Sequence, residues 1–421
     1  MIEADDGLAA RRAEQVARES YGRLLAHLAS AWRDVSSAQD ALAEAFEAAL
    51  THWPERGVPE NPVAWLAAVA RRKLLDQARS RRIAQQSEEH VIRRFEELAT
   101  AVDDPDALPD RRLALMLICA HPAIDPNIRA PLMMQVVLGV EAARIASAYL
   151  VAPATMGQRL SRAKAKIRDA GIPFTFADAE ERVERIASVL DALYGAFSIS
   201  HDEAFADDPS GQGLAEEAIW LARVVVSLSA GEPEPLGLLA LFLFIHARRG
   251  ARRDEDGRYV PLTGQDTTRW RAATVDEAEA HLLLAAERQV VGRFQLEAAI
   301  QSAHCVRRHG QRVAWDAIAT LYGRLQEMTG SRVVEVNRAV ALATAGDLAE
   351  GLEILRAVEG KGSLGSFQPF WAAKAELHAR AGWVGSAVAA YDRAIGLERD
   401  PAVRNFLLTR QAQVSAQHSF V

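Results

Sequence analysis

The stretch AARIASAYLVAPATMGQRLSRAKAKIR, residues 142–168, decides the fold of the chain and the kind of function it supports. Two helical patterns flank a short break at residues 150–152. The second begins at Pro153, which suits the first position of a helix because its missing N–H would be unpaired there. Its apolar residues recur at helical spacing on one face: Met156, Leu160, Ala163 and Ile167. A short helix, a three-residue turn and an amphipathic helix predict a helix-turn-helix unit.

The other face of the second helix is polar and basic. It carries Thr155, Gln158, Arg159, Arg162 and Lys166, with Lys164 beside it. Five basic residues and no acidic ones lie between residues 159 and 168. A helix of this kind enters the major groove of DNA in helix-turn-helix proteins, so the pattern favours nucleic-acid binding. The alternative is a solvated amphipathic helix whose Lys and Arg are ordinary surface residues.

The composition is that of an ordinary globular protein with several domains. The chain has 421 residues, of which 49% are hydrophobic and 25% charged. Two cysteines argue against a disulfide framework and favour a reducing compartment. The N-terminal sequence does not resemble a signal peptide, and no apolar run reaches the length of a membrane span. We therefore expect a cytoplasmic protein with no membrane partner.

The net charge of −7 is unevenly distributed along the chain. Residues 1–170 hold 23 Lys/Arg and 23 Asp/Glu, which leaves 26 basic and 33 acidic residues for the remainder. The acidic excess thus belongs to the C-terminal part. In the N-terminal part, basic residues cluster at 71–82 and 159–168, which is the local asymmetry that nucleic-acid contact requires.

Three helical patterns precede the helix-turn-helix, at residues 8–29, 38–50 and 62–82, and the predicted fold class is all-α. The segment THWPERGVPEN, residues 51–61, contains two prolines and a glycine, which predicts an irregular loop. Six of the twelve residues at 71–82 are basic, a pattern suited to phosphate contact. A solvated surface helix is the alternative for that segment.

Several motifs together resemble a known family. They are D-x-x-x-E-A-F at residues 40–46, A-W-L-x-x-V-A-R-R at 64–72, D-x-x-R at 76–79 and the helix-turn-helix at 142–168. In this order they resemble regions two and four of the extracytoplasmic-function (ECF) group of sigma-70-type RNA polymerase sigma factors. The segments 110–124 and 154–173 are similar to one subgroup, whose members carry a long C-terminal extension with tetratricopeptide-like repeats.

The resemblance implies a chain that binds core RNA polymerase and directs it to a subset of promoters. Region two would occupy residues 1–83, with Asp40, Glu44 and Glu47 on the face toward the β′ clamp. Its DNA contacts, at the −10 element, would be Trp53, Arg71, Arg72, Lys73, Arg79 and Arg82. Trp53 is expected in the loop and is preferred over Trp65 as a residue that stacks on a base.

Region four would occupy residues 109–172, after a linker at 84–108, and would bind the −35 element. Gln158 and Arg162, one turn apart, have the chemistry to read adenine and guanine edges. The remaining residues of the face would contact phosphates or flank the bases: Thr155, Arg159, Lys164 and Lys166. Gly157 and Ser161 depart from the family, in which larger side chains are common there, and Ala43 stands where glutamine is common.

The C-terminal part, residues 180–421, is helical in pattern throughout, with one polar interruption at 250–270 that predicts an exposed or partner-binding loop. Residues 339–355 align with 375–391 at an offset of 36, close to the tetratricopeptide period. Repeats near 333–400 therefore predict a surface for a protein or peptide partner. By its position, the extension is expected to regulate the sigma regions.

No catalytic constellation is recognisable, and we expect neither enzymatic activity nor a cofactor. The pairs Cys119/His121 and His304/Cys305 each lack the second half of a zinc site, so no metal site is expected. The first alternative function is a helix-turn-helix transcriptional regulator with a repeat-type sensor domain that does not join polymerase. A second is a repeat-based adaptor with no affinity for nucleic acid.

Overall fold

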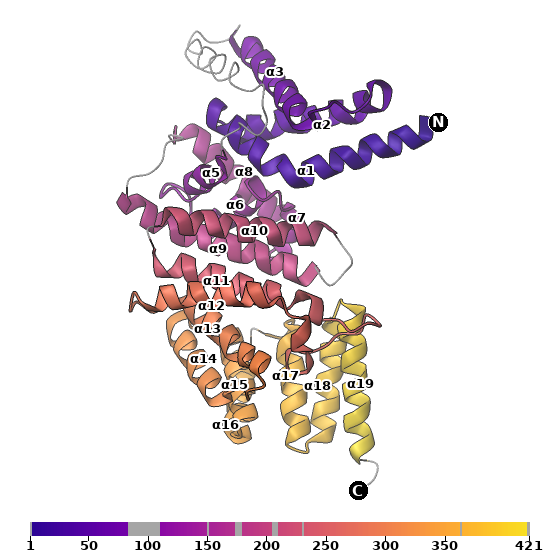
Figure 1. The fold of residues 1–421 in the computed structure, drawn as a ribbon, viewed down its shortest axis with the longest axis vertical. Helices are drawn as coiled ribbons and strands as arrows, with labels where there is room; N and C mark the ends of the chain where they lie inside the picture. The colour runs from indigo at the N-terminus through magenta and orange to yellow at the C-terminus, as the bar shows by residue number, and fades with distance from the viewer. Residues whose placement is uncertain are drawn as a thin grey trace. The chain divides into compact units, whose positions relative to one another are not determined.

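The computed structural model describes residues 2–82, 110–149, 151–172, 179–203, 209–229, 231–362 and 364–418. Within these residues all regular elements are helices, and the β-type pairing is limited to an isolated bridge between Arg253 and Tyr259. The expected all-α fold is confirmed (Figure 1). In the described part of the chain, no helix is long and apolar enough to cross a membrane. The chain forms two compact units, Met1–Val224 and Val225–Val421.

The first unit begins with three helices: α1 (Ile2–Trp32), α2 (Val35–Arg56) and α3 (Pro62–Arg82). Asp34 caps α2, since its carboxylate accepts from the Ser36 N–H at 3.0 Å. The side chain of Asn61 caps α3 in the same way, through the Ala64 N–H at 3.1 Å. The apolar stripes of the three helices meet in one core, which includes Leu24, Leu42, Leu66 and Leu74.

The predicted loop at 51–61 is wrong in its first half. Helix α2 continues through Pro54 to Arg56 and ends at Gly57, whose φ is +83°. Proline mid-helix normally removes a hydrogen bond, but Pro54 lies in the last turn, and the buried Trp53 beside it anchors that turn in the core. The irregular connection is therefore only the segment from Gly57 to Asn61.

The helix-turn-helix has the predicted form. Two supporting helices, α5 (Arg112–Cys119) and α6 (Pro126–Val136), precede α7 (Ala142–Ala148) and α8 (Pro153–Asp169). The predicted stripe of α8 is buried, with exposed fractions of 1% for Met156, Leu160 and Ile167 and 5% for Ala163. Burial of that stripe fixes which face of α8 remains accessible.

The next two helices pack onto this domain. They are α9 (Ala179–Glu203) and α10 (Pro209–Leu228). Arg185 of α9 donates to the carbonyl of Leu117 in α5. Gly195 of α9 faces Met134 of α6, whose Sδ would lie 3.2 Å from a Cβ at that glycine. The division between the two units falls within α10, so it does not coincide with the domain boundary expected at 172–180.

The second unit starts with α11 (Pro233–Ala247), α12 (Ala272–Ala286), α13 (Arg293–Cys305) and α14 (Trp315–Thr329). Helix α11 is buried on nearly all sides, as its apolar composition requires. The polar interruption before α12 is ordered as three short 3-10 helices, η2 (Arg249–Ala251), η3 (Leu262–Gly264) and η4 (Thr267–Arg269). Arg307, in a fourth short helix, η5 (Val306–His309), donates to the carbonyls of Leu262 and Gln265 and ties this segment to the helical core.

Two helical hairpins and a final helix complete the unit. The hairpins are α15 (Arg332–Ala345) with α16 (Leu348–Gly360), and α17 (Gln368–Arg380) with α18 (Val384–Leu397), followed by α19 (Pro401–His418). The second hairpin begins 36 residues after the first, and so does its second helix. The turns contain glycines of positive φ at corresponding positions, Gly346 (+127°) and Gly382 (+76°).

Substitution of Gly351 by alanine should destabilise the first hairpin by about 1–3 kcal/mol. A Cβ at Gly351 would lie 2.7 Å from the Ala339 carbonyl oxygen and 3.1 Å from the Ala343 Cβ, so α15 and α16 would have to separate. Gly385→Ala is the matched control, because nothing lies within 4 Å of a Cβ there. Urea unfolding combined with hydrogen exchange in α15 and α16 measures the difference; equal effects of both substitutions would contradict the close crossing.

Candidate nucleic-acid and polymerase interface

The polar face of α8 is open to solvent. Thr155, Gln158, Arg159, Arg162 and Lys166 are all exposed, opposite the buried apolar stripe. Within the described chain, none of these five side chains makes a hydrogen bond or an ion pair. The charges and hydrogen-bonding groups of this face are thus available to an external ligand. The buried apolar stripe on the opposite face holds α8 in place.

Lys164 is placed differently from the other cations of α8. Its Nζ donates to Oε1 of Gln39 in α2 at 2.9 Å, and the side chain is half-buried. Burial lowers the pKa of Lys164, while the carboxylate of Asp40 acts in the opposite direction. The structure therefore separates Lys164 from the open face, and a phosphate contact would require it to leave α2.

The basic side of α3 is only partly free. Arg72 and Lys73 are exposed, whereas Arg71 is half-buried and burial lowers the pKa of its guanidinium. The Nζ of Lys73 lies 2.9 Å from Oε2 of Glu44, an ion pair that joins a predicted DNA contact to a predicted polymerase contact. The backbone of α3 includes the other two predicted contacts, but the side chains of Arg79 and Arg82 lie outside the described residues.

The acidic face of α2 is accessible at both ends. Asp40 and Glu47 are exposed, and Glu44 between them is half-buried through its pairing with Lys73. The i, i+4, i+7 spacing does place them on one side of the helix, away from the buried Leu42, Ala45 and Ala49. Their contact with polymerase remains a prediction.

Trp53 and Trp65 reverse the expected preference for a stacking residue. Trp53 is 3% exposed and meets Trp65 edge to face, with ring centroids 5.6 Å apart. Trp65, on α3, is half-buried and is the more accessible ring. Trp53 is thus a core residue in this structure, because α2 extends further than its prolines suggested.

The two cysteines are buried thiols. Burial raises the pKa of Cys119 to about 12 and that of Cys305 to about 11, so neither is a reactive thiolate near neutral pH. Among the described residues, no three His, Cys, Asp or Glu side chains come together as metal ligands.

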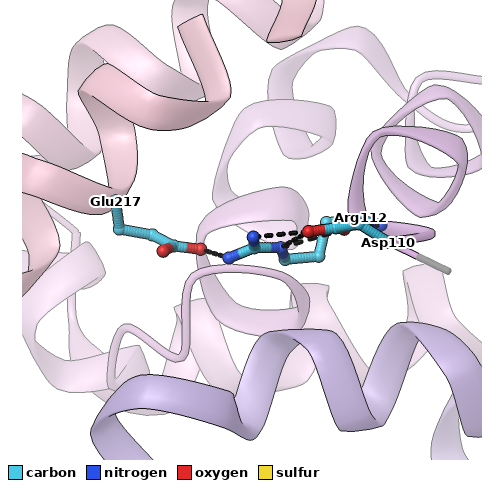
Figure 2. Close-up of polar contacts among 3 residues, drawn as sticks. All are labelled: Asp110, Arg112 and Glu217. Atoms are coloured by element: carbon cyan, nitrogen blue, oxygen red, sulfur yellow. Dashed lines mark hydrogen bonds and ion pairs between the residues drawn. The ribbon is translucent and has the colours of Figure 1, made fainter. Parts of the chain in front are cut away.

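A buried arginine that sequence reasoning missed connects α5 to α10 (Figure 2). Arg112, whose side chain is 9% exposed, pairs with Asp110 and with Glu217 of α10. Its guanidinium also stacks on the ring of Trp220, with its central carbon 4.3 Å from the ring centroid. Since Glu217 is 105 residues away in sequence, no local pattern could indicate the pair.

His27 of α1 is a buried titratable residue. It lies near Arg71 of α3 and Arg111, which precedes α5. It is 6% exposed, and burial together with the positive charges of Arg71, Arg111 and Arg23 lowers its pKa to about 4. In an unfolded chain the pKa of a histidine is about 6.5, well above its value in the folded protein. His27 therefore contributes stability that is complete above pH 6.5 and is lost as the pH falls toward 4.

Between pH 7 and pH 4, the free energy of unfolding of the first unit should fall by ~2–3 kcal/mol less in His27→Gln than in the wild-type protein. The measurement is the free energy of opening of α1, from hydrogen exchange at several pH values between 4 and 7. His52→Gln serves as control for the exchange of histidine for glutamine, because His52 is exposed on α2. If the opening free energy of α1 depended on pH in the His27 variant as it does in the wild-type protein, a group other than His27 would be responsible for that dependence.

The comparisons with known proteins agree with this geometry. Residues 18–83, which span the C-terminal part of α1 together with α2 and α3, match sigma-70 region 2. Residues 185–286, from α9 to the end of α12, match a family of unknown function (DUF6596). An uncharacterized protein of Rhizobium meliloti (strain 1021) is 33% identical over 415 residues, which cover 96% of this chain and 95% of that protein. No solved structure matches significantly.

The region-2 match supports a sigma-70-type sigma factor with a role in transcription initiation. The chain belongs to the same family as the Rhizobium meliloti protein, with which it aligns over nearly its whole length.

Proposed function

We propose that the chain is a sigma factor of the ECF type, with region two in residues 1–83 and region four in residues 109–172, joined by a linker at 84–108. In this proposal region two binds the β′ clamp of core RNA polymerase and the −10 element, and region four binds the −35 element. Residues 180–421 regulate the two sigma regions. Polymerase performs the chemistry, and the chain acts as a cytoplasmic specificity subunit.

One observation carries the proposal: a helix-turn-helix with an unoccupied polar-basic face follows a region-2 domain in the same chain. The exposed Gln158 and Arg162 lie one turn apart on α8, at the spacing needed to reach neighbouring base pairs. Arg159 and Lys166 flank them and suit phosphate contacts, which position the helix without specifying sequence.

The role of the extension is supported by the way its first helices pack. Arg112, at the start of region four, is held between Asp110 and Glu217 of α10 (Figure 2). Helix α9 packs against α5 and α6. Region four thus makes its own core with part of the extension, which gives the extension a direct route to influence it. We further propose that the hairpins near 333–400 are tetratricopeptide-like and bind a protein or peptide partner, which their 36-residue offset supports.

The first test is gel filtration of the full chain with bacterial core RNA polymerase, beside a fragment of residues 1–230. The fragment keeps α9 and α10, without which region four would lose part of its core. Co-elution of the full chain is the expected result. Co-elution of the fragment alone would make the extension an inhibitor. If neither co-elutes while duplex DNA is bound, the chain is a free-standing helix-turn-helix regulator and the proposal is wrong.

Two substitutions on α8 separate base reading from phosphate contact. Arg162→Ala should weaken the preferred −35 sequence by ~1–3 kcal/mol and relax its sequence preference, whereas Lys166→Ala should weaken all promoters evenly and lower the salt slope by about one. Both side chains are exposed and make no hydrogen bond or ion pair within the described part of the chain, so neither change should disturb folding. Promoter binding by the polymerase complex at several salt concentrations measures both; identical profiles for the two variants would contradict the assignment.

A further inference from the structure

An arginine at the end of α11 is buried without a carboxylate beside it. Arg248 follows the last residue of α11 and is 6% exposed. Its Nη2 donates to Oε1 of Gln301, whereas its Nη1 has no hydrogen-bond partner among the described residues. Within the same part of the chain Arg248 forms no ion pair. Buried charges in proteins are normally paired, because the interior replaces hydration poorly, so the isolation of Arg248 requires a reason.

A second arginine adds positive charge at the same place. The guanidinium carbons of Arg248 and Arg307 each lie 5.8 Å from the ring centre of Trp270. Two other titratable groups near them carry no negative charge around neutral pH. Burial raises the pKa of the Cys305 thiol to about 11. Burial and the two arginines lower the pKa of His304 to about 4. The group around the indole therefore has two cations and no anion.

The carboxylates of α12 that lie near this group are bonded to other residues. Oδ1 of Asp276 is 2.8 Å from Nη2 of Arg308. Glu279, whose charge acts on Cys305, accepts from the hydroxyl of Ser302 at 2.8 Å. In the described chain neither carboxylate pairs with Arg248 or Arg307. The positive charge around Trp270 is thus not compensated from within the described residues.

Three buried polar atoms of this group have no hydrogen-bond partner among the described residues. Two are donors, Nη1 of Arg248 and Nε1 of Trp270, and one is an acceptor, Oε1 of Gln265. The orientation of the Gln265 amide is fixed, since its Nε2 donates to the carbonyl of Val260 at 3.3 Å. Arg307, which lies against Trp270, also donates to the backbone carbonyl of Gln265 at 3.0 Å. Contacts with Trp270 and Arg307 therefore place all three atoms in one neighbourhood.

The chemistry of these groups fits inorganic phosphate better than other small ligands. Phosphate oxygens accept from guanidinium and indole N–H groups, and their negative charge compensates the arginines. Hydrogen phosphate keeps a proton at neutral pH, which it can donate to the amide oxygen of Gln265. Sulfate has no such proton. A water molecule can satisfy the hydrogen bonds, but it leaves the two positive charges uncompensated.

A phosphate ion reaches these covered atoms only if part of the protein moves, and the segment 249–269 is suited to such movement. Only Ala251 and Gln265 are buried in it. A segment with so few buried side chains opens at a low cost in free energy. Arg269 and Arg271, at its end, are exposed, and their charges attract an anion toward the segment.

We propose that Arg248, Gln265, Trp270 and Arg307 form a binding site for inorganic phosphate in the extension. Arg248 and Trp270 donate to phosphate oxygens, and Gln265 accepts the phosphate proton. Arg307 supplies the second positive charge. The site lies within the second unit, and three of its residues belong to the range that matches the family of unknown function. The proposal does not depend on the sigma function, and it gives the extension a small ligand of its own.

The test is isothermal titration calorimetry of the full chain in phosphate-free buffer at constant ionic strength. Inorganic phosphate should bind saturably at one site, and sulfate should bind at least tenfold more weakly. Equal binding of sulfate would mean an adventitious ion only. Adenosine 5′-monophosphate is the third titrant, and tighter binding of this ester than of phosphate would overturn the assignment to the free ion. Absence of phosphate binding would overturn the site altogether.

Two variants connect the binding to the residues of the site. Trp270→Phe keeps an aromatic ring but removes the N–H, and Arg248→Met removes the charge; each should weaken phosphate binding at least tenfold. The matched controls are Trp383→Phe, at an indole that is 45% exposed, and Arg312→Met, at an exposed arginine. Both controls should bind phosphate as the wild-type protein does.

A stability measurement separates ligand binding from a purely structural role. Phosphate should raise the urea midpoint of the wild-type protein and of both controls, and should leave the midpoint of Arg248→Met unchanged. If Arg248→Met fails to fold, Trp270→Phe gives the same comparison. Wild-type phosphate affinity in Trp270→Phe and in a folded Arg248→Met would contradict the site, whether or not the chain binds polymerase.

Discussion

The burial of one apolar stripe on α8 is the constraint on which the rest of the first unit depends. Because Met156, Leu160, Ala163 and Ile167 must be covered, the opposite face, with its cations and Gln158, is turned to solvent. Helices α2, α6 and α7 pack against α8. Helix α9, from the following sequence, packs on the supporting helices, through Gly195 against Met134 of α6. The helix-turn-helix is therefore part of a larger helical domain.

Two buried basic residues lie in opposite electrostatic environments. Arg112 is surrounded by two carboxylates and an indole ring, which offset the loss of hydration. The charged groups that act on His27 among the described residues are the arginines Arg71, Arg111 and Arg23, which together with burial lower its pKa. The first arrangement joins segments far apart in sequence, and the second couples the stability of the α1 junction to pH. Both follow from the same desolvation penalty.

The sequence was sufficient for what depends on local periodicity. The helices and the helix-turn-helix follow from spacings within about twenty residues, and the offset of the two hairpins follows from a sequence repeat of 36 residues. Trp53 was misplaced because prolines favour a loop, whereas the core contact of the indole keeps Pro54 inside the last turn of α2. The pairs Arg112–Glu217 and Lys164–Gln39 were not predictable, because they depend on how separate helices pack and no motif marks them. The sequence predicted which side chains of α8 are exposed to solvent, except that Lys164 is half-buried and bonds to Gln39.

The helix-turn-helix domain has two neighbouring surfaces of different chemistry, and they differ in the free energy needed to separate them. Toward α9 and α10 the contact is an apolar core with a buried, multiply paired arginine, and breaking it would leave Arg112 without its α10 carboxylate. Toward α1 and α2, the contacts include exposed or half-buried hydrogen bonds such as Lys164 with Gln39 and Arg111 with Ser30. Such hydrogen bonds contribute about 0.5–1.5 kcal/mol each, because water replaces the lost partner when they break. These hydrogen bonds therefore cost less free energy to break than the buried pairing of Arg112 with Glu217, which would leave a desolvated charge without its partner.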